Sequence, residues 1–369
     1  MKIAILGHKR IPSREGGVEA VVEELSTRMV KLGHNVTVYN RKGNNVQDKN
    51  IKTNKIKEYK GIKIKQTFTF QNKYLNALVY TIITSVKCLF NNYDVIHYHA
   101  EGPCSMIWLP HLFGKRTVAT IHGLDWERSK WGGFATRFLK FGEKMAVRYA
   151  NEIIVLSQDT KDYFAKNYNR ETKFIPNGVN KPEIKGAEII KNKWGLEKDS
   201  YILFLGRVVP EKGVHYLIDA YKNLNTDKKL VIAGGSSHTN DYLEKIKSKV
   251  KNDKNIIMTG FVQGQVLDEL YSNCFLYCLP SDLEGMPLSL LEAMSYGANV
   301  LTSDITECTQ ITGEYGSSFK KGDVLDLEKK LKDCLENNNR RKQEEISEYV
   351  LSRYNWNDIV KETLNLYKG

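Results

Sequence analysis

Two carboxylates in the second half of the chain indicate a ligand site. Glu284 and Glu292 are separated by seven residues, and Gly285-Met286-Pro287 follows the first of them directly. Proline suits the first position of a helix, so Pro287 is predicted to open one, with Glu284 in the preceding loop and Glu292 about one and a half turns inside. The N–H groups at a helix N-terminus attract phosphate. A ligand with a diphosphate and sugar hydroxyls, such as a nucleotide sugar, fits this combination.

A second charged group lies earlier, where a strand is expected to end and a helix to begin. The run Gly206-Arg207-Val208-Val209-Pro210-Glu211-Lys212-Gly213 places two cations at that turn. The Arg207 guanidinium can bind two phosphate oxygens at once, and Lys212 adds a compact positive charge. The alternative is a pair of surface cations in a salt bridge with Glu211. The presence of Glu284 and Glu292 favours the phosphate-binding interpretation.

Short apolar runs alternate with helical patterns in both halves of the chain. This alternation predicts mostly parallel sheets covered by helices on both faces. The expected strands are 2–7, 35–39, 95–99, 116–122, 152–156, 173–175, 201–205, 229–233, 255–259, 275–279 and 299–302. The expected helices include 18–32, 134–149, 215–224, 241–250, 265–271 and 288–296. The predicted fold class is α/β, with two Rossmann-like doubly wound domains.

A chain of 369 residues is long for a single core, so two domains are expected. The segment 176–199, which contains prolines and glycines, separates an N-terminal domain at 1–180 from a C-terminal domain at 181–350. Residues 351–369 are expected to form a helix that can pack back on the N-terminal domain. Open α/β sheets bind ligands beyond the carboxyl ends of their strands, which makes the cleft between the two domains the expected site.

Part of the net charge of +12 is concentrated in one segment. The seventeen residues 49–65 contain Glu58 as the only acid and seven lysines: Lys49, Lys52, Lys55, Lys57, Lys60, Lys63 and Lys65. One interpretation is a solvated hairpin edge, where lysine prevents pairing with other chains. The other is attraction to an anionic membrane surface. Nucleic acid is disfavoured as a partner because no recognised binding motif accompanies the charge.

Three features favour a cytoplasmic protein. The N-terminal run 2–7 is too short for a signal peptide and is expected to be a buried strand. The longest apolar stretch, 74–90, contains Asn76 and Lys87 and is predicted to be a buried helix rather than a membrane span. The six cysteines form no Cys-x-x-Cys pair, which favours reduced thiols. With the lysine-rich segment, the predicted location is cytoplasmic, with peripheral association at the inner face of the membrane as an open alternative.

Several motifs, each weak alone, follow one another in a recognisable order. They are Gly16-Gly17-Val18-Glu19, His122-Gly123, Pro176-Asn177-Gly178-Val179, Gly206-Arg207 with Glu211-Lys212-Gly213, Gly260-Phe261, and the segment from Glu284 to Glu292. In this order and spacing they resemble the family 4 glycosyltransferases, which have the GT-B fold, over nearly the whole chain. The N-terminal run and Gly123-Leu124-Asp125-Trp126 resemble the bacterial rhamnosyltransferase subgroup of surface-polysaccharide assembly.

The resemblance implies roles for residues of the C-terminal domain. Arg207 and Lys212 would bind the donor diphosphate. Glu284 would contact the transferring sugar, and Glu292 the ribose hydroxyls. Val262 would lie near the base. Sugar or phosphate oxygens would be received by the backbone of a short run, namely Gly285, Met286, Pro287 and Leu288.

The resemblance also assigns donor contacts in the N-terminal domain. His122 ends an expected strand, where a structural role is the commoner one, but the matching histidine of the family reaches the donor sugar. His122 is therefore a catalytic candidate together with Arg207, Lys212 and Glu284. Gly16 and Gly17 precede a helix and allow close backbone approach to the donor, and the alternative is a simple turn.

Acceptor contacts are assigned to three further residues, His99, Asp125 and Trp126. His99 shares a strand face with His97, and plain packing is the alternative. The two histidines lack an evident third partner for a metal. Asp125 and Trp126 belong to the run 122–131, which is either a loop over the acceptor or a segment that rests on the membrane.

The sequence contains no Asp-x-Asp pair, which a metal-dependent transferase would use to hold a divalent ion on the diphosphate. We therefore expect no metal and no other cofactor, since Arg207, Lys212 and the helix amides can neutralise the leaving group. Two departures from the family pattern, at Asn180 and at Asn299, involve none of the candidate residues.

The predicted function is that of a retaining, metal-independent glycosyltransferase in bacterial cell-surface polysaccharide synthesis. It would move a sugar from a nucleotide-sugar donor to a saccharide acceptor, which is lipid-linked in the favoured case. The favoured donor is dTDP-rhamnose, followed by UDP-hexose and UDP-N-acetylhexosamine. Two other classes stay open. A sugar-nucleotide epimerase of the same fold would need acid–base carboxylates that cannot be placed in the first domain, and a non-catalytic nucleotide-sugar binder would show binding without turnover.

Overall fold

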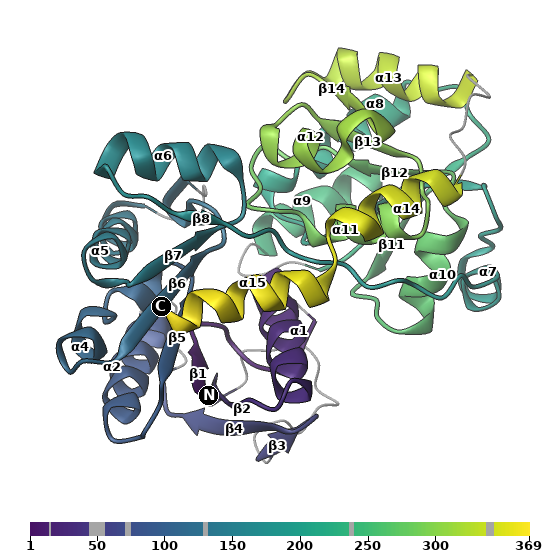
Figure 1. The fold of residues 1–369 in the computed structure, drawn as a ribbon. Coiled ribbons are helices and arrows are strands. Elements are labelled where there is room, and N and C mark those ends of the chain that lie inside the picture. Colours follow the sequence, from purple (N-terminus) through teal and green to yellow (C-terminus); the bar gives the residue numbers. More distant parts are fainter. Residues whose placement is uncertain (15, 44–55, 71–74, 128–131, 236–239, 337–342) are drawn as a thin grey trace. The chain divides into compact units, whose positions relative to one another are not determined.

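The computed structural model describes residues 1–14, 16–43, 56–70, 75–127, 132–235, 240–336 and 343–369 (Figure 1). They form two compact units. Unit 1 comprises Met1–Asn177 and Trp356–Gly369, and unit 2 comprises Gly178–Asn355. Unit 2 is therefore inserted into unit 1 along the sequence, and each unit has its own sheet.

The described strands of unit 1 form a sheet in the order β3-β4-β2-β1-β5-β6-β7-β8. They are β1 (Lys2–Leu6), β2 (Asn35–Arg41), β3 (Glu58–Tyr59), β4 (Ile62–Thr67), β5 (Val95–His99), β6 (Arg116–Ile121), β7 (Glu152–Val155) and β8 (Lys173–Phe174). Neighbouring strands are parallel except for β3 and β4. The strand order reverses between β1 and β5, and ligands of such sheets bind beyond the carboxyl ends of the strands at this point.

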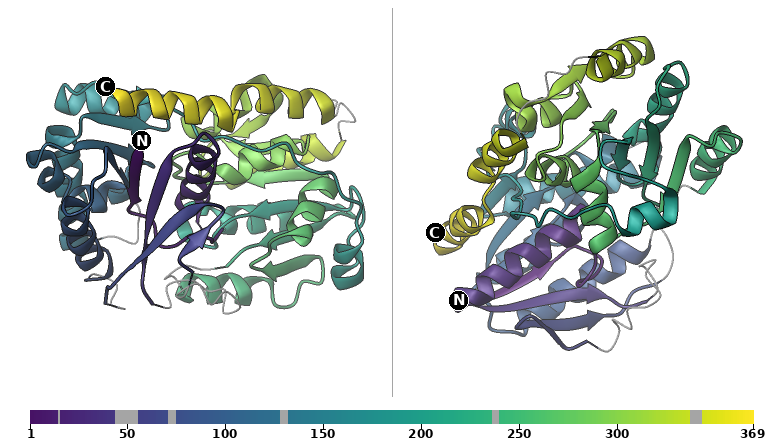
Figure 2. Two further views of the ribbon diagram at one scale, coloured as in Figure 1. Left: turned by 60° about the horizontal axis from the view of Figure 1, so that its bottom comes forward. Right: turned by 90° about the vertical axis from the view of Figure 1, so that its right-hand side faces the viewer.

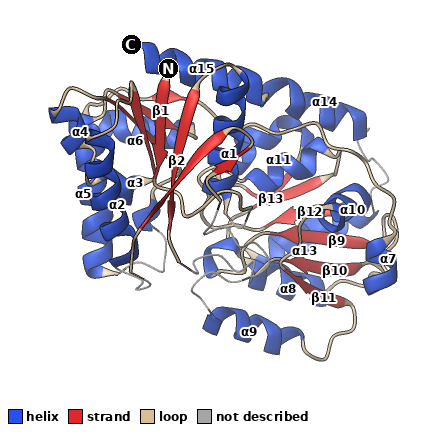
Figure 3. Cartoon of the chain, turned by 90° about the horizontal axis from the view of Figure 1, so that it is seen from below, coloured by secondary structure: helices blue, strands red, loops and turns tan. Residues whose placement is uncertain are grey.

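Helices cover both faces of this sheet (Figure 3). On one face lie α1 (Gly17–Lys31) and α15 (Trp356–Lys368), and on the other lie α2 (Leu75–Leu89), α4 (Trp108–Leu112) and α5 (Gly133–Tyr149). The short α3 (Glu101–Cys104) packs against α5, and α6 (Gln158–Tyr168) packs against β7 and β8. Local sequence fixes some helix ends: the Ser157 hydroxyl accepts a hydrogen bond from the Thr160 N–H and caps α6.

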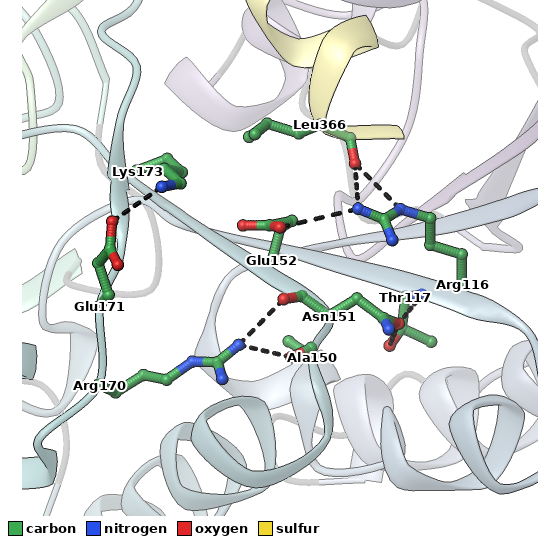
Figure 4. Close-up of polar contacts among 9 residues, drawn as sticks. All are labelled: Arg116, Thr117, Ala150, Asn151, Glu152, Arg170, Glu171, Lys173 and Leu366. Atoms are coloured by element: carbon green, nitrogen blue, oxygen red, sulfur yellow. Dashed lines mark hydrogen bonds and ion pairs between the residues drawn. The ribbon is translucent and has the colours of Figure 1, made fainter. Parts of the chain in front are cut away.

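The last helix is held to unit 1 by specific contacts. It runs beside α1 (Figures 1 and 2). Arg116 at the start of β6 donates from Nε and Nη2 to the Leu366 carbonyl oxygen, over 3.0 and 2.6 Å, and pairs with Glu152 at 3.7 Å (Figure 4). The buried Tyr367 hydroxyl lies 2.6 Å from Nδ1 of His97 in β5. These contacts make the C-terminal residues part of the unit 1 core.

The described strands of unit 2 form a parallel sheet in the order β11-β10-β9-β12-β13-β14. They are β9 (Tyr201–Leu205), β10 (Lys229–Ala233), β11 (Ile256–Gly260), β12 (Leu276–Leu279), β13 (Val300–Ser303) and β14 (Ser317–Phe319). The helices are α7 (Ile189–Trp194), α8 (Val214–Lys222), α9 (Asn240–Val250), α10 (Gln265–Asn273), α11 (Leu288–Ser295), α12 (Thr306–Thr312), α13 (Val324–Glu336) and α14 (Gln343–Arg353). The order reverses between β9 and β12, which is the switch point of this sheet.

The predicted α/β fold with two doubly wound sheets is confirmed. The strands and helices expected from the alternating pattern are present, with ends that differ by two residues at most. The helix expected at 351–369 is present as α15 but begins five residues later, at Trp356. The lysine-rich segment forms an edge in its described part, where β3 and β4 make an antiparallel pair. Lys49, Lys52 and Lys55 lie outside the described residues.

The predicted domain limits after residues 180 and 350 differ from the observed ones. The chain leaves unit 1 after Asn177 and re-enters it at Trp356. The chain re-enters unit 1 later than predicted because α14 continues to Arg353 and the Val179 N–H donates to the Tyr354 carbonyl oxygen over 2.8 Å. That hydrogen bond holds both connecting segments in unit 2.

The expectation of a buried helix at 74–90 is only half right. The helix α2 lies there, but one of its sides faces solvent: Ile82, Val86 and the following Phe90 are 39, 38 and 84% exposed. Within the described ranges, no helix is both long enough and apolar enough to span a membrane.

Candidate active site

In unit 2, two loops follow the strands on either side of the switch point. The loop 206–213 follows β9, and the loop 280–287 follows β12. The Asp282 N–H donates to the Glu211 carbonyl oxygen over 2.9 Å and joins the two loops. Gly213 has a φ of +65°, and a Cβ atom there would lie 1.9 Å from the Pro280 carbonyl oxygen. Because glycine alone fits this approach, the side chains of the two loops can meet.

Lys212 and Glu284 form a salt bridge between these loops. Their Nζ and Oε1 atoms lie 2.5 Å apart, and their side chains are 12 and 8% exposed. The Ser281 hydroxyl donates to the same carboxylate oxygen over 2.6 Å. Water is largely excluded, so this pair interacts more strongly than an exposed ion pair does. The alternative in which Lys212 is a surface cation bridged to Glu211 is therefore wrong.

The helix after Glu284 begins at Leu288, and Pro287 is its N-cap residue with φ −74° and ψ 102°. Pro287 thus stands one position before the place expected for it, because its extended ψ keeps it outside the helix. The N–H groups of Leu290 and Leu291 donate to the Pro287 carbonyl oxygen, so those directed out of the helix N-terminus are the N–H groups of Leu288 and Ser289. Glu292 lies in the second turn, four residues after Leu288.

Glu292 is held in place from a neighbouring helix. The hydroxyl of Tyr271 in α10 donates to Glu292 Oε2 over 3.1 Å, with the Ser289 carbonyl oxygen as a second acceptor at 3.2 Å. Tyr271 itself is buried. The carboxylate is therefore oriented before any ligand arrives.

The remaining candidate residues of unit 2 lie at the same carboxyl edge of the sheet. Arg207 is half-buried in the loop after β9. Gly285 and Met286 connect Glu284 to the start of α11. Val262 follows β11 and is partly buried, and β10 separates β11 from β9. The positive groups at this edge are thus Arg207, Lys212 and the N-terminus of α11.

In unit 1, the candidate histidines meet beside the switch point. Gly7 after β1 has a φ of +114°, and a Cβ atom there would lie 2.1 Å from the carbonyl oxygen of His99 at the end of β5. His122 follows β6, and its Nε2 lies 2.9 Å from His99 Nδ1. The other ring nitrogen of His99, Nε2, is buried without a hydrogen-bond partner in the described structure. Such an atom is unusual in a folded protein, and His99 as a whole is fully buried.

The ring of His97 lies beside the pair formed by His99 and His122, with its centroid 4.2 Å from that of His99. His97 lies 2.7 Å from Thr120 Oγ1 and 2.6 Å from the Tyr367 hydroxyl, so its role is internal packing. Burial lowers the pKa of His97 to about 3. Burial, with further contributions from His97 and His122, lowers the pKa of His99 well below its ordinary value. Both rings are neutral at pH 7 and can exchange hydrogen bonds without carrying charge.

Trp126 is anchored inside unit 1 rather than free to move. It lies in the single turn Asp125–Glu127 after β6, and its indole N–H donates to Glu143 Oε2 over 3.0 Å. The hydroxyls of Tyr163, at 3.0 Å, and Tyr168 donate to the other carboxylate oxygen. The polar edge of the indole is therefore occupied, and Lys140 Nζ lies over the ring, 4.0 Å from its centroid. Residues 128–131 of the predicted loop lie outside the described residues.

A second buried carboxyl lies near this turn. Glu101 follows β5 and is fully buried. Burial, and then the neighbouring carboxylates of Asp125 and Glu143, raise the pKa of Glu101 to about 10. Glu101 is therefore protonated at neutral pH.

We expect Glu101→Gln to reduce the loss of stability at alkaline pH. The unfolded chain ionises Glu101 above its ordinary pKa of 4.5 while the folded protein keeps it protonated. The wild-type protein therefore loses stability as the pH rises from that value towards the folded pKa, by up to about 1.4 kcal/mol per pH unit. Urea unfolding at several pH values from about 6 to 9 should show that the free energy of unfolding of the variant rises relative to that of the wild type as the pH rises. A difference that stays constant with pH would contradict this expectation.

The glycine pair lies at the start of α1. Gly16 is the N-cap residue, and Gly17 is the first residue of the helix. Glu19 Oε1 accepts a hydrogen bond from the Lys9 N–H over 2.8 Å, and a Cβ atom on Gly16 would lie 2.2 Å from Glu19 Oε2. Gly16 thus makes room for the carboxylate that ties the loop after β1 to the N-terminus of α1.

Sequence reasoning missed Tyr271, Glu143 and Tyr367, although each fixes a candidate residue. They lie 21, 17 and 270 residues from the partners Glu292, Trp126 and His97. No local pattern marks them, because the contacts exist only once the helices have packed. Among the described residues, no group of three or more His, Cys, Asp or Glu side chains is arranged to hold a metal ion.

Two doubly wound sheets, the second with a lysine–glutamate pair and a helix N-terminus at its switch point, define a GT-B glycosyltransferase. Two family models match the chain: Glycosyltransferase Family 4 over residues 15–181 and Glycosyl transferases group 1 over residues 186–351. Together the matches span nearly all of both units. The chain belongs to this glycosyltransferase family, and the predicted GT-B fold is confirmed.

Known relatives match part or all of this chain. An uncharacterized glycosyltransferase of Methanocaldococcus jannaschii is 27% identical, with 100% of this chain and 98% of the relative aligned. The UDP-Gal:alpha-D-GlcNAc-diphosphoundecaprenol alpha-1,3-galactosyltransferase of Escherichia coli is 27% identical over 58% of each chain. The crystal structure of Anabaena HepE in complex with UDP and glucose has a TM-score of 0.82 and 16% identity, with 100% of this chain and 99% of that one covered. The last comparison shows the fold alone.

Proposed function

We propose that the protein is a retaining, metal-independent glycosyltransferase of cell-surface polysaccharide synthesis. It transfers a sugar from a nucleotide-sugar donor bound by unit 2 to a saccharide acceptor carried on a lipid and bound by unit 1. The observation that carries this proposal is the buried Lys212–Glu284 pair beside the N-terminus of α11. The pair places a cation that can bind a diphosphate next to a carboxylate that can accept hydrogen bonds from sugar hydroxyls.

The charge that develops on the departing diphosphate is met by groups already in position. Arg207, Lys212 and the first N–H groups of α11 stabilise the phosphate oxygens, and groups oriented beforehand are the most effective ones. Glu284 holds the Lys212 ammonium in place while the site is empty. When the Lys212 ammonium also pairs with phosphate oxygens, the Glu284 carboxylate accepts hydrogen bonds from the sugar hydroxyls. Glu292, oriented by Tyr271, receives the ribose hydroxyls.

The acceptor hydroxyl then attacks the sugar from the face that the diphosphate leaves. A diphosphate oxygen takes the proton of the attacking hydroxyl, which explains why no side chain of the candidate site is assigned as a nucleophile. His122 contacts the donor sugar, and His99, Asp125 and Trp126 contact the acceptor. Exclusion of water around the reacting groups favours transfer over hydrolysis.

The donor sugar is the least constrained part of the proposal. The N-terminal motifs favour dTDP-rhamnose. The similarity to the UDP-Gal:alpha-D-GlcNAc-diphosphoundecaprenol galactosyltransferase of Escherichia coli supports UDP-hexose or UDP-N-acetylhexosamine and a lipid-linked acceptor.

The test is nucleotide release from a panel of UDP-, dTDP- and GDP-sugars, with membrane lipid extract and excess EDTA. Release from one donor that persists in EDTA and increases with extract is the expected result. Loss of release in EDTA would refute metal independence. Release that is unaffected by extract, with interconversion of the sugar, would instead identify an epimerase, and donor binding without release would identify a non-catalytic binder.

We expect Tyr271→Phe to weaken donor binding with little effect on the chemical step. The variant loses one hydrogen bond to a charged partner, Glu292, which corresponds to about a tenfold rise in the donor KM. The turnover number should stay within about twofold, because Glu292 contacts the ribose and not the reacting atoms. Steady-state kinetics with the preferred donor measure both constants. A fall in turnover at unchanged KM would contradict the role given to Glu292.

A further inference from the structure

One helix of unit 1 turns its polar side inward. The buried residues of α2 are Tyr80, Thr81, Thr84, Ser85 and Cys88, four of which carry hydroxyls. Its outward side carries Ile82 and Val86, and Phe90 follows directly. The apolar side of a helix in a globular protein ordinarily faces the core. The outward side of α2 therefore resembles a surface built to meet an apolar medium.

Neighbouring elements extend this surface in both directions. The helix α4 packs against α2, and its Leu112 and the following Phe113 are 64 and 67% exposed. At the other end, Phe68 and Phe70 follow β4, are 53 and 48% exposed, and lie with their rings 5.3 Å apart. The Asn76 side chain donates to the Phe70 carbonyl oxygen over 2.8 Å and so fixes this pair to the first turn of α2. We call the whole set the apolar ridge: Phe68, Phe70, Ile82, Val86, Phe90, Leu112 and Phe113.

The segments that carry the apolar ridge are rich in lysine, and the nearest acid along the chain is the exposed Asp94, which follows Tyr93 directly. Residues 62–93 contain four lysines and no acid, and residues 102–124 contain no acid either. Lys65 Nζ donates to Asn91 Oδ1 over 2.8 Å at the end of α2, and Lys115 Nζ donates to the Tyr93 carbonyl oxygen over 3.5 Å. Both cations therefore lie at the Phe90 end of the ridge. Lys63 and Lys87 are exposed on β4 and α2.

We propose that this flank of unit 1 docks on an anionic membrane surface. The apolar ridge enters the boundary between headgroups and acyl chains, and Lys63, Lys65, Lys87 and Lys115 pair with lipid phosphates. Exposed apolar side chains with a rim rich in lysine match both parts of an anionic bilayer, whereas an acidic protein partner would match the rim alone. The surface differs from the Lys49–Lys65 segment considered from the sequence, because its centre is the outward side of α2.

The position of the ridge agrees with the proposed lipid-linked acceptor, on which this inference rests. α2 has fifteen residues and is about 22 Å long. Phe68 and Phe70 follow the carboxyl end of β4, whereas Phe90 precedes the amino end of β5. The ridge thus reaches from the amino edge of the sheet to the carboxyl edge, where His99 and His122 lie. An acceptor held in the bilayer would approach those residues from the docked side.

Sedimentation with sucrose-loaded vesicles tests the proposal on the full chain. The vesicles are phosphatidylcholine alone or with about 30 mol% phosphatidylglycerol. Wild type should sediment with the anionic vesicles only, and 0.5 M NaCl should weaken its binding. F90S/L112S/F113S and K63Q/K87Q should each lower the partition coefficient by about tenfold or more. The matched control is L325S, because Leu325 of α13 in unit 2 is 75% exposed and lies outside the ridge.

Three results would overturn the proposal: no sedimentation of wild type with anionic vesicles, equal sedimentation of wild type and F90S/L112S/F113S, or an equal loss in L325S. Concentration-dependent dimerisation that the triple substitution abolishes, without vesicle binding, would assign the ridge to a second copy instead. Thermal melting confirms that each variant is folded, and K63Q/K87Q decides the question if the triple variant is not.

Nucleotide release with detergent-dispersed lipid extract as the source of acceptor, and without vesicles, separates this inference from the proposed function. Release should be equal in all four proteins, because the ridge residues lie outside the candidate site. Vesicle binding without release from any donor would refute the transferase proposal alone. Release without vesicle binding would refute the docking surface alone.

Discussion

Lys212→Met will lower the rate of nucleotide release at saturating donor by about a hundredfold to a thousandfold, the cost of removing one preorganised group that stabilises developing charge. The structure adds a second expected effect. Without Lys212, the 8% exposed Glu284 side chain has lost its cation, and breaking a buried pair in this way costs about 3–5 kcal/mol of stability. Urea unfolding and nucleotide release on the same samples measure the two effects.

The double variant K212M/E284Q separates folding from catalysis. Removal of both charges takes away the unpaired carboxylate, so most of the stability should return while activity stays low. The control is K249Q, since Lys249 pairs with Asp219 at 2.6 Å in the same unit but with side chains 32 and 43% exposed. Such a surface pair contributes about 0–1 kcal/mol, and the control should keep wild-type activity. Activity that returned together with stability in the double variant would disprove the catalytic role of the pair.

Gly213→Ala should abolish activity and destabilise unit 2 by about 3 kcal/mol or more, through left-handed strain of about 1–2 kcal/mol and steric overlap with backbone. The added Cβ would lie 1.9 Å from the Pro280 carbonyl oxygen, and a backbone carbonyl cannot move aside as a flexible side chain can. The loops after β9 and β12 must then separate. Lys212 would be displaced from Glu284, although neither residue is changed.

Gly195→Ala is the matched control for that variant. Gly195 has nearly the same φ, +62°, but the nearest atom to its added Cβ is Lys229 Nζ at 3.6 Å. It should lose only about 1 kcal/mol of stability and keep its activity. Chemical denaturation and nucleotide release compare the two variants. Equal losses would mean that the left-handed backbone, and not the approach to Pro280, explains the need for glycine.

The central strands were predictable because parallel strands buried on both faces are unbroken apolar runs. β9, with the sequence Tyr-Ile-Leu-Phe-Leu, and β10 were located to the residue. β4 was not among the expected strands, since Lys63 and Lys65 alternate there with Ile62 and Ile64 as on a half-exposed edge. β14 has only one buried residue, Phe319, and gives no such run.

The candidate site was predictable as a set of residues but not as a set of contacts. Lys212 and Glu284 stand out through their motifs, yet they are 72 residues apart, and their contact depends on the space that Gly213 leaves. The apolar pattern of α2 was equally visible in the sequence. Its direction was not, because periodicity shows that a helix has two sides and does not show which side meets the sheet.

The insertion of unit 2 into unit 1 sets an order of events during protein synthesis. The ribosome delivers Met1–Asn177 before unit 2, but Tyr367 and Leu366, which bind His97 and Arg116, follow after it. The intervening unit 2 has 178 residues, from Gly178 to Asn355, so at ordinary elongation rates of 5–20 residues per second they follow after about 10 to 35 s. During that interval His97 and Arg116 must wait for their partners. The first unit therefore stays incomplete until α15 has been made, and unit 2 can finish folding before it.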